Sequence, residues 1–240
     1  MALPVVYINL ASDSNRRARM EAEFARHAVP GQRFDAIRWT ALPEAEQARL
    51  YSTTLNAGQF HKPLVNGEKG CYASHLRCWQ WLLDSPHAAV VVLEDDVALK
   101  REFAAVITAI EQLPGGWDMV KLIGRDSEKL RRRLPLLAGF SLVDYQRVPS
   151  LTAGYVISRS GAQKLLASRI PFGRPIDVDL RHWWENDLRI QGVVPAAVVL
   201  DDTSFQSSIG AKASEGSMAT SWRKFRYKAA YTALNLVHRR

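Results

Sequence analysis

The chain has 240 residues, the size of one domain or of one domain with appendages. Hydrophobic residues make up 47% and charged residues 23%, a balance that excludes an intrinsically disordered chain. The net charge is +8, but six basic residues and no acidic one lie within 222–240. The positive charge therefore belongs mostly to a C-terminal tail, and we expect no nucleic-acid partner for the body of the protein.

The first half of the chain alternates apolar runs with helical patterns. Residues 5–10 are nearly all apolar, as in a strand buried on both faces, and a capped helix follows them. Residues 31–66 are turn-rich, and we expect a loop there with a short helix near 43–50. A clear helical stripe covers 68–84, and the clearest strand covers 88–93.

The second half continues the alternation of helices with strands. We expect a helix near 101–112 and a buried strand at 118–123, whereas 125–150 is basic and weakly periodic. The later elements are a strand at 154–158, a helix at 160–168, a helix at 177–191 that Gly192 ends, and a final strand at 193–200.

The alternation predicts an α/β fold with a mainly parallel central sheet flanked by helices. After a polar loop at 201–221, the tail from Trp222 can form a helix. We therefore divide the chain into one domain, 1–221, and a basic, aromatic tail, 222–240.

The two cysteines and the N-terminal residues indicate the cellular compartment in which the protein works. Cys71 and Cys78 would lie about 10 Å apart along one helix axis, too far for a disulfide, so we expect two free thiols. The N-terminus lacks the basic start of a signal peptide, and no apolar run approaches the roughly 18 residues that span a bilayer. We therefore expect a cytoplasmic protein, soluble or peripheral on the cytoplasmic face of a membrane.

Three consecutive carboxylates, Glu94, Asp95 and Asp96, follow the clearest strand. Ligands of open α/β sheets bind beyond the carboxyl ends of strands, and adjacent carboxylates repel one another unless a cation lies between them. One interpretation is a site for Mg²⁺ or Mn²⁺, shared with substrate phosphates. The other interpretation is a solvated turn. Because a buried strand precedes the triplet, we give the two interpretations about equal weight.

Four segments, taken in order, resemble glycosyltransferase family 25, the bacterial lipopolysaccharide group that includes lipooligosaccharide galactosyltransferases. They are 6–10 (VYINL) with 14–17 (SNRR), 67–71 (GEKGC) with Ser74 and His75, 91–96 (VVLEDD), and 152–158 (TAGYVIS) with 161–162 and 175–177 (PID). Each segment is weak alone, but the ordered set is fairly specific and extends from residue 5 to about 200.

The resemblance implies a fold similar to GT-A and transfer of a sugar, with inversion, from a nucleotide-sugar donor. The default donor is UDP-galactose, and the implied acceptor is a lipopolysaccharide or lipooligosaccharide core or a similar glycan. The ion would be Mn²⁺ or Mg²⁺, held by Asp96 first and Asp95 second. The residues expected to contact the donor are Ile8, Asn9, Leu10, Arg16, Arg17, Glu94 and Asp95.

Inversion in one displacement requires a base for the acceptor hydroxyl. Asp177 is the first candidate and Asp179 the second, with Glu185 and Asp187 as rivals; a helix cap is an equal alternative for Asp177.

The residues considered for contact with the acceptor are Ser74, His75, Tyr155 and Trp184. A histidine or tryptophan at positions such as His75 and Trp184 more often packs in the core than contacts a substrate. Cys71, His75 and Cys78 share a helical face, but one helix seldom provides zinc spacing, so zinc is not expected.

The tail mixes Trp222, Phe225, Tyr227 and Tyr231 with basic residues, and we hypothesise that it docks on an anionic membrane surface. The alternative is a solvated basic tail.

Two other functions compete with the transferase. One is a Mg²⁺-dependent phosphotransferase or nuclease that uses the same carboxylates. The other is a non-catalytic membrane-surface binding module with a degenerate transferase core. No GxxxxGK[ST] or GxGxxG pattern is present, which disfavours P-loop and dinucleotide enzymes.

Overall fold

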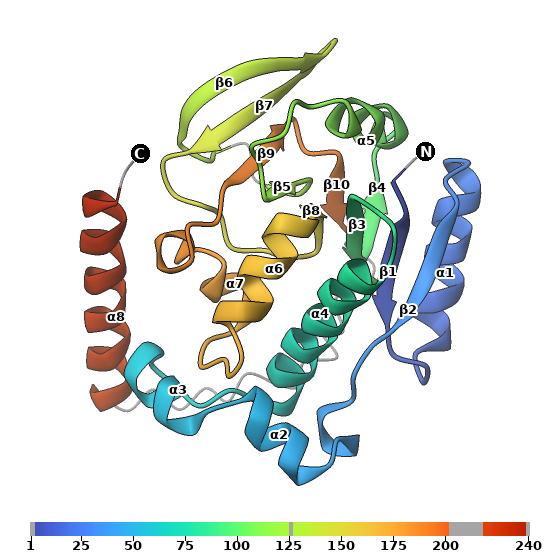
Figure 1. The fold of residues 1–240 in the computed structure, drawn as a ribbon. Coiled ribbons are helices and arrows are strands. Elements are labelled where there is room, and N and C mark those ends of the chain that lie inside the picture. The colour runs from blue at the N-terminus through green and yellow to red at the C-terminus, as the bar shows by residue number, and fades with distance from the viewer. Residues whose placement is uncertain (1–2, 125–126, 202–217, 239–240) are drawn as a thin grey trace.

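The computed structural model describes residues 3–124, 127–201 and 218–238, the last segment with side chains from 222 onward. Its centre is an eight-stranded sheet (Figure 1). The strands, in spatial order, are β2 (Gly31–Asp35), β1 (Val5–Asn9), β3 (Ala89–Glu94), β8 (Gly154–Ser158), β5 (Met119–Lys121), β9 (Ile190–Val194), β7 (Phe140–Tyr145) and β6 (Leu130–Leu137).

Most strands of this sheet run in one direction, although four of the seven neighbouring pairs are antiparallel. β1 is parallel to β2 and β3, and β9 is parallel to β5, whereas β8 is antiparallel to both of its neighbours. β7 is antiparallel to β9 and β6, so six of the eight described strands run in one direction. The predicted α/β, GT-A-like architecture is confirmed, with β8 and β7 as the reversed strands.

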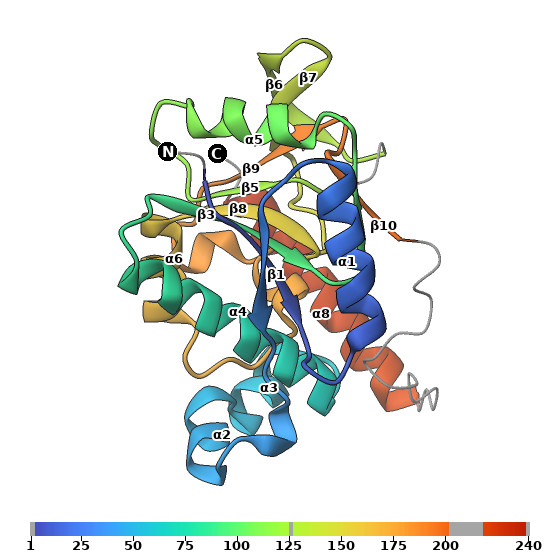
Figure 2. The ribbon, with the colours of Figure 1, turned by 90° about the vertical axis from the view of Figure 1, so that its right-hand side faces the viewer.

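Helices cover both faces of the sheet, and alternate strand residues enter two separate cores. Val5 and Tyr7 pack with α1 (Ser14–Arg26) and α5 (Phe103–Glu111), whereas Val6 and Ile8 pack with α4 (Asn66–Asp84) and α6 (Arg159–Ser168). Figure 2 shows α1 and α4 on opposite sides of β1. A short second sheet pairs β4 (Val97–Leu99) with β10 (Val198–Leu200), directly after the acidic triplet.

Two regions expected to be irregular contain strands. The 31–66 region holds β2, the helical turn η1 (Trp39–Ala41), and the helices α2 (Glu44–Leu50) and α3 (Thr53–Gln59). The 125–150 region forms the β6–β7 hairpin. Both β2 and β6 are edge strands with exposed polar residues, so their sequences lack the apolar signal of a central strand.

The predicted helix at 177–191 is wrong. The chain forms the short helix α7 (Ile176–Asp179) and a second helical turn, η2 (Trp183–Glu185), and then enters β9, which contains Gly192. Asp187 has φ of 55°, which ends any helix there. The strand predicted at 193–200 is likewise divided, and Pro195 lies in the gap between β9 and β10.

The tail forms the helix α8 (Met218–Val237) and packs against the body of the protein. Tyr231 is buried beside His182 and Trp184, and the Arg181 guanidinium lies 4.4 Å from the centre of the Tyr231 ring. Most of the loop predicted at 201–221 lies outside the described residues.

Two further predictions concern the thiols and the membrane. The thiols of Cys71 and Cys78 are free, as expected. No helix in the described part of the chain is long and apolar enough to cross a bilayer.

Gly70 allows α4 to approach the segment that follows β2. A Cβ at Gly70 would lie 2.6 Å from the carbonyl oxygen of Ile37, so the backbone must shift to admit one. We predict that Gly70→Ala lowers the free energy of unfolding by about 1–3 kcal/mol in urea titrations. Gly58→Ala is the matched control in α3, where nothing lies within 4 Å, and it should be neutral or stabilise by up to about 1 kcal/mol. Equal effects of the two changes would contradict this close packing.

Candidate active site

A cavity of about 350 Å³ opens where β1 and β3 end. Because these two strands are parallel neighbours, their carboxyl ends and the segments that follow them meet at one edge of the sheet. The lining residues come from four parts of the chain: Ile8, Leu10, Asp13 and Arg16; residues 36–40; Asn66, Gly67, Gly70, Cys71, Ser74 and His75; and residues 94–96. The acidic triplet therefore faces a cavity and not open solvent.

Asp95 is fixed by residues that follow β1. The amide of Asn9 donates to Asp95 Oδ2 at 2.7 Å, and Nη1 of Arg16 contacts Oδ1 at 2.7 Å. The backbone of the triplet is held by Arg19, which donates to the carbonyl oxygens of Asp95 and Val97. Both Asp95 oxygens thus have protein partners, which leaves this residue poorly placed as the main ligand of a metal ion.

Glu94 is also fixed, from the opposite side. Its Oε1 accepts a hydrogen bond from Thr152 Oγ1 at 3.0 Å and lies 3.5 Å from Nε2 of His75. Burial opposes ionisation of this carboxyl, but the contacts with His75 and Thr152 and the charge of Lys121 hold its pKa below the ordinary value. Glu94 therefore carries a negative charge at neutral pH.

Asp96 is the carboxylate whose charge is least compensated. Its Oδ1 is buried and makes no hydrogen bond to a described residue. Burial, together with repulsion from Glu94 and Asp95, raises the pKa of Asp96 to about 6, against the opposing effect of Arg16. A buried acceptor in a negative field is stabilised by a cation.

These observations test whether a divalent ion fits the site. Mg²⁺ and Mn²⁺ prefer oxygen ligands, and Mg²⁺ often uses one or two carboxylates together with substrate phosphates. Asp96 provides such an oxygen at the cavity wall, whereas Asp95 is already bound by Asn9 and Arg16. The oxygen ligands present fit a divalent ion, for which Asp96 would be the protein ligand.

Ser74 and His75 lie on the wall of the cavity, as α4 brings them there. The Ser74 hydroxyl accepts from the backbone N–H of Ile37 at 2.8 Å and donates to Gly70, so it holds α4 against the segment after β2. Tyr155 is fully buried behind His75, and its hydroxyl lies 2.7 Å from His75 Nδ1. Tyr155 therefore supports His75 and does not line the cavity.

Asp177 lies near the triplet without lining the cavity. Its charge interacts with those of Glu94, Lys121 and Arg181, and burial together with Glu94 raises its pKa. Lys121 is fully buried in β5, where burial lowers its pKa to about 8 and its ammonium donates to the carbonyl of Leu151. A carboxylate with a raised pKa is suited to accept a proton.

Asp179, the second candidate for the catalytic base, belongs to a network of ion pairs and hydrogen bonds. Its carboxylate accepts a hydrogen bond from the Tyr72 hydroxyl and pairs with Arg174 at 2.8 Å and Arg169 at 3.3 Å. The same two arginines bind Glu185 and help to lower its pKa to about 2 against the effect of burial. Both carboxylates are thus paired with arginine side chains.

Three other predicted residues do not line the cavity. Arg17 is half exposed and pairs with Glu21 at 2.8 Å. Trp184 packs against Tyr231 of α8. Asp187 is largely exposed and lies 4.0 Å from the ammonium of Lys164. We therefore omit all three from the candidate site.

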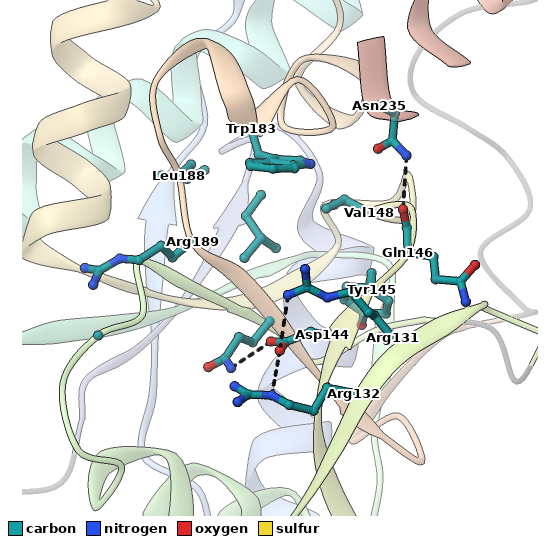
Figure 3. Close-up of a pocket in the computed structure, with 13 residues that line it drawn as sticks. Arg131, Arg132, Asp144, Tyr145, Gln146, Val148, Trp183, Leu188, Arg189 and Asn235 are labelled. Atoms are coloured by element: carbon teal, nitrogen blue, oxygen red, sulfur yellow. Dashed lines mark hydrogen bonds and ion pairs between the residues drawn. The ribbon is translucent and has the colours of Figure 1, made fainter. Parts of the chain in front are cut away.

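A second cavity, of about 340 Å³, lies at the opposite edge of the sheet (Figure 3). It is lined at the beginning of β9 and the end of β7, and Trp183 lies on its wall. Arg131 and Arg132 face it and pair with Asp144. It contains none of the predicted site residues.

Sequence reasoning missed Arg19, Lys121 and Thr152. A lysine within the apolar run 118–123 was the available signal, because a charge in a buried strand needs a partner or a function. Nothing comparable distinguishes Arg19 from its neighbours Arg16 and Arg17.

The chain belongs to glycosyltransferase family 25: the family model described as "Glycosyltransferase family 25 (LPS biosynthesis protein)" matches residues 3–180. It is 29% identical over 185 residues to procollagen galactosyltransferase 2 of Homo sapiens, covering 73% of this chain and 29% of that protein. It is 31% identical over 186 residues to procollagen galactosyltransferase 1 of Danio rerio, covering 73% of this chain and 30% of that protein.

One further relative carries a different description. The chain is 30% identical over 215 residues to the "Probable inactive glycosyltransferase 25 family member 3" of Bos taurus, covering 77% of this chain and 34% of that protein. The matches thus span about a third of the length of these relatives. The family and these relatives support a glycosyltransferase.

The two carboxylates of α7 should respond differently to replacement. Asp179→Ala removes one of the two carboxylates that pair with the buried Arg169 and Arg174 and leaves them Glu185 alone, so we predict a loss of up to about 3–5 kcal/mol in the free energy of unfolding. Asp177→Ala should leave stability unchanged or raise it, because burial disfavours that charge. Urea denaturation followed by circular dichroism measures both. Equal losses in the two variants would contradict the separate roles.

Proposed function

We propose that this chain is a metal-dependent, inverting glycosyltransferase that uses a nucleotide-sugar donor. The observation that carries the proposal is Asp96, a half-buried residue at a cavity beyond the carboxyl ends of β1 and β3, whose buried Oδ1 makes no hydrogen bond to a described residue. UDP-galactose is the first donor to test, since two of the relatives are named galactosyltransferases. A lipopolysaccharide or similar glycan is the first acceptor class, in line with the description of the family.

The donor would occupy the cavity. Ile8 and Leu10 supply apolar walls, while Asn9 acts through Asp95 by holding it in place. Glu94 presents a charged carboxylate that can accept hydrogen bonds from sugar or ribose hydroxyls. Arg16 lies at the wall beside Asp95 and adds positive charge near the diphosphate.

A bound Mn²⁺ or Mg²⁺, held by Asp96, would supply positive charge to the diphosphate as it leaves. The acceptor hydroxyl oxygen forms the new bond to the anomeric carbon as the bond from that carbon to the diphosphate oxygen breaks. The bonding electron pair leaves with the nucleotide diphosphate, and the hydroxyl proton goes to Asp177. Attack from the face opposite the leaving group inverts the anomeric centre.

The two competing functions, a phosphotransferase or nuclease and a non-catalytic module, require different sites. A phosphotransferase or nuclease of the two-metal type needs two ions about 4 Å apart. In the described residues the one cluster of metal-ligating side chains is Cys71, His75 and Glu94, which is not the all-oxygen set that such chemistry uses. A non-catalytic module would bind a donor or a membrane without turnover.

A donor panel tests the proposal. We expect Mn²⁺-dependent UDP release from one preferred UDP-sugar, and loss of that release in EDTA and in Asp96→Asn. Asp177→Asn should lower kcat by about 10²–10⁴ with little change in the KM for donor, because it removes the base and leaves the cavity intact. The matched control is Asp187→Asn, an exposed carboxylate outside the cavity that should keep full activity. Normal turnover in Asp177→Asn would assign the base elsewhere, and no turnover with any donor would favour the non-catalytic module.

We also propose that α8 attaches the protein to an anionic membrane surface. Tyr231 and Tyr227 face the body, whereas Trp222 and Phe225 are each 61% exposed on the outer side and stack with ring centres 5.7 Å apart. Residues 223, 224, 226 and 228 are basic and exposed around them. Aromatic side chains flanked by positive charge favour the interface of an anionic bilayer.

Vesicle sedimentation tests this attachment. We predict that the wild-type chain sediments with phosphatidylserine vesicles at low salt and that Trp222→Ser/Phe225→Ser sediments several-fold less. Leu134→Ser is the control, since Leu134 is an exposed apolar residue on β6, away from α8. Equal sedimentation of the double variant and the control would rule out α8 as the attachment.

A further inference from the structure

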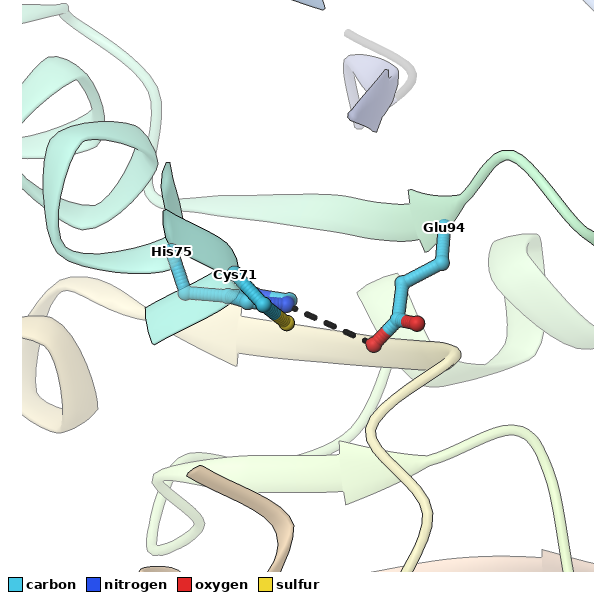
Figure 4. A group of neighbouring side chains, drawn as sticks. All are labelled: Cys71, His75 and Glu94. Atoms are coloured by element: carbon cyan, nitrogen blue, oxygen red, sulfur yellow. Dashed lines mark ion pairs between the residues drawn. The ribbon is translucent and has the colours of Figure 1, made fainter. Parts of the chain in front are cut away.

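Three side chains with different ligand atoms meet on the wall of the active-site cavity. Cys71 and His75 are four residues apart on α4 and so project from the same face of the helix, while Glu94 reaches them from the end of β3 (Figure 4). One ligand atom from each side chain lies within 4.8 Å of the other two. The 3.5 Å between His75 Nε2 and Glu94 Oε1 is close to the separation of about 3.4 Å expected for two ligands of a tetrahedral zinc ion.

The histidine supplies a second, independent observation. His75 is fully buried, and its Nε2 has Glu94 Oε1 at 3.5 Å as its neighbour, without a hydrogen bond of ordinary geometry to a described residue. Its Nδ1 lies 2.7 Å from the hydroxyl of Tyr155, and that hydroxyl also accepts a hydrogen bond from Trp79 Nε1 at 2.9 Å. The ring is therefore held from behind with Nε2 toward Cys71 and Glu94, an outer-shell support typical of histidines that bind metals.

We propose that Cys71, His75 and Glu94 form a Zn²⁺ site, separate from the Asp96 site. A thiolate and an imidazole select zinc over Mg²⁺ and Mn²⁺, which prefer the all-oxygen surroundings of Asp96. Three protein ligands leave a fourth position, and it faces the cavity because all three residues line that cavity. Zinc was not expected from the sequence, because Cys71, His75 and Cys78 lie on one helix, which seldom gives the close spacing of zinc ligands, and no fourth ligand was evident. Cys78, which also belongs to α4, is fully buried in the core. The third ligand is instead Glu94, which is distant in sequence.

The proposal has a consequence for the donor, which rests on the proposed function. Glu94 is the residue that we assign to donor hydroxyl groups, so a zinc ion that engages Glu94 would compete with the donor for the cavity. Zinc would then inhibit transfer, whereas Mn²⁺ at Asp96 would support it.

The binding test uses Zn²⁺ alone, without any donor. We expect equilibrium dialysis to give one Zn²⁺ per wild-type chain, and Co²⁺ substitution to give a sulfur-to-cobalt charge-transfer band. Cys71→Ser should lose the band and bind Zn²⁺ at least tenfold more weakly. Cys78→Ala, the matched control on the same helix, should keep both properties. Circular dichroism confirms that each variant is folded.

Three results would overturn the zinc site: no stoichiometric Zn²⁺ on the wild-type chain, unchanged affinity in Cys71→Ser, or loss of the cobalt band in Cys78→Ala. A titration with UDP-galactose then tests the competition, and Zn²⁺ should weaken donor binding in the wild type but not in Cys71→Ser. Because zinc binding is measured without donor, a failure of the transferase proposal would leave the zinc result standing. A transferase that binds no zinc would overturn this inference alone.

Discussion

The position of Asp96 at the cavity depends on how its neighbour Asp95 is bound. Asn9 and Arg16 occupy its two carboxylate oxygens, and Arg19 holds the backbone on either side of Asp96. These contacts fix the turn between β3 and β4 while using no group of Asp96 itself. Asp96, the next residue, therefore lies at the cavity wall with a buried Oδ1 that makes no hydrogen bond to a described residue. If Asp95 were free, the three carboxylates could rearrange toward solvent, and no position for a cation would be defined.

The carboxylates of α7 and η2 also differ in whether an arginine pairs with them. Asp177 and Asp179 lie two residues apart on α7, yet only Asp179 has arginine partners among the described contacts. Burial therefore raises the pKa of Asp177, whereas paired arginines tie Asp179 and Glu185 into the fold. Carboxylates that arginine does not pair, such as Asp177, remain available to a ligand, whereas paired carboxylates such as Asp179 stabilise the fold.

Features that local sequence patterns define could be predicted from the sequence, whereas features that depend on contacts between distant residues could not. The strand β3, the helix α4 and the acidic triplet were predictable because local apolar patterns and neighbouring residues define them. β2 and β6 were not, because edge strands with exposed polar residues depend on their partners for definition. The true path of 177–191 depends on Arg169 and Arg174, and no local pattern reveals which carboxylate those arginines bind. The grouping of Cys71, His75 and Glu94 likewise exists only after α4 packs beside β3.

The central claim is that Asp96 binds a donor diphosphate through a divalent ion. Isothermal titration of UDP into the folded chain, with Mn²⁺ and again with EDTA, tests this claim without needing an acceptor or the right sugar. The account predicts binding of UDP that requires Mn²⁺ in the wild type and is lost in Asp96→Asn. Equally tight binding of UDP in EDTA, or unchanged Mn²⁺-dependent binding in Asp96→Asn, would contradict it.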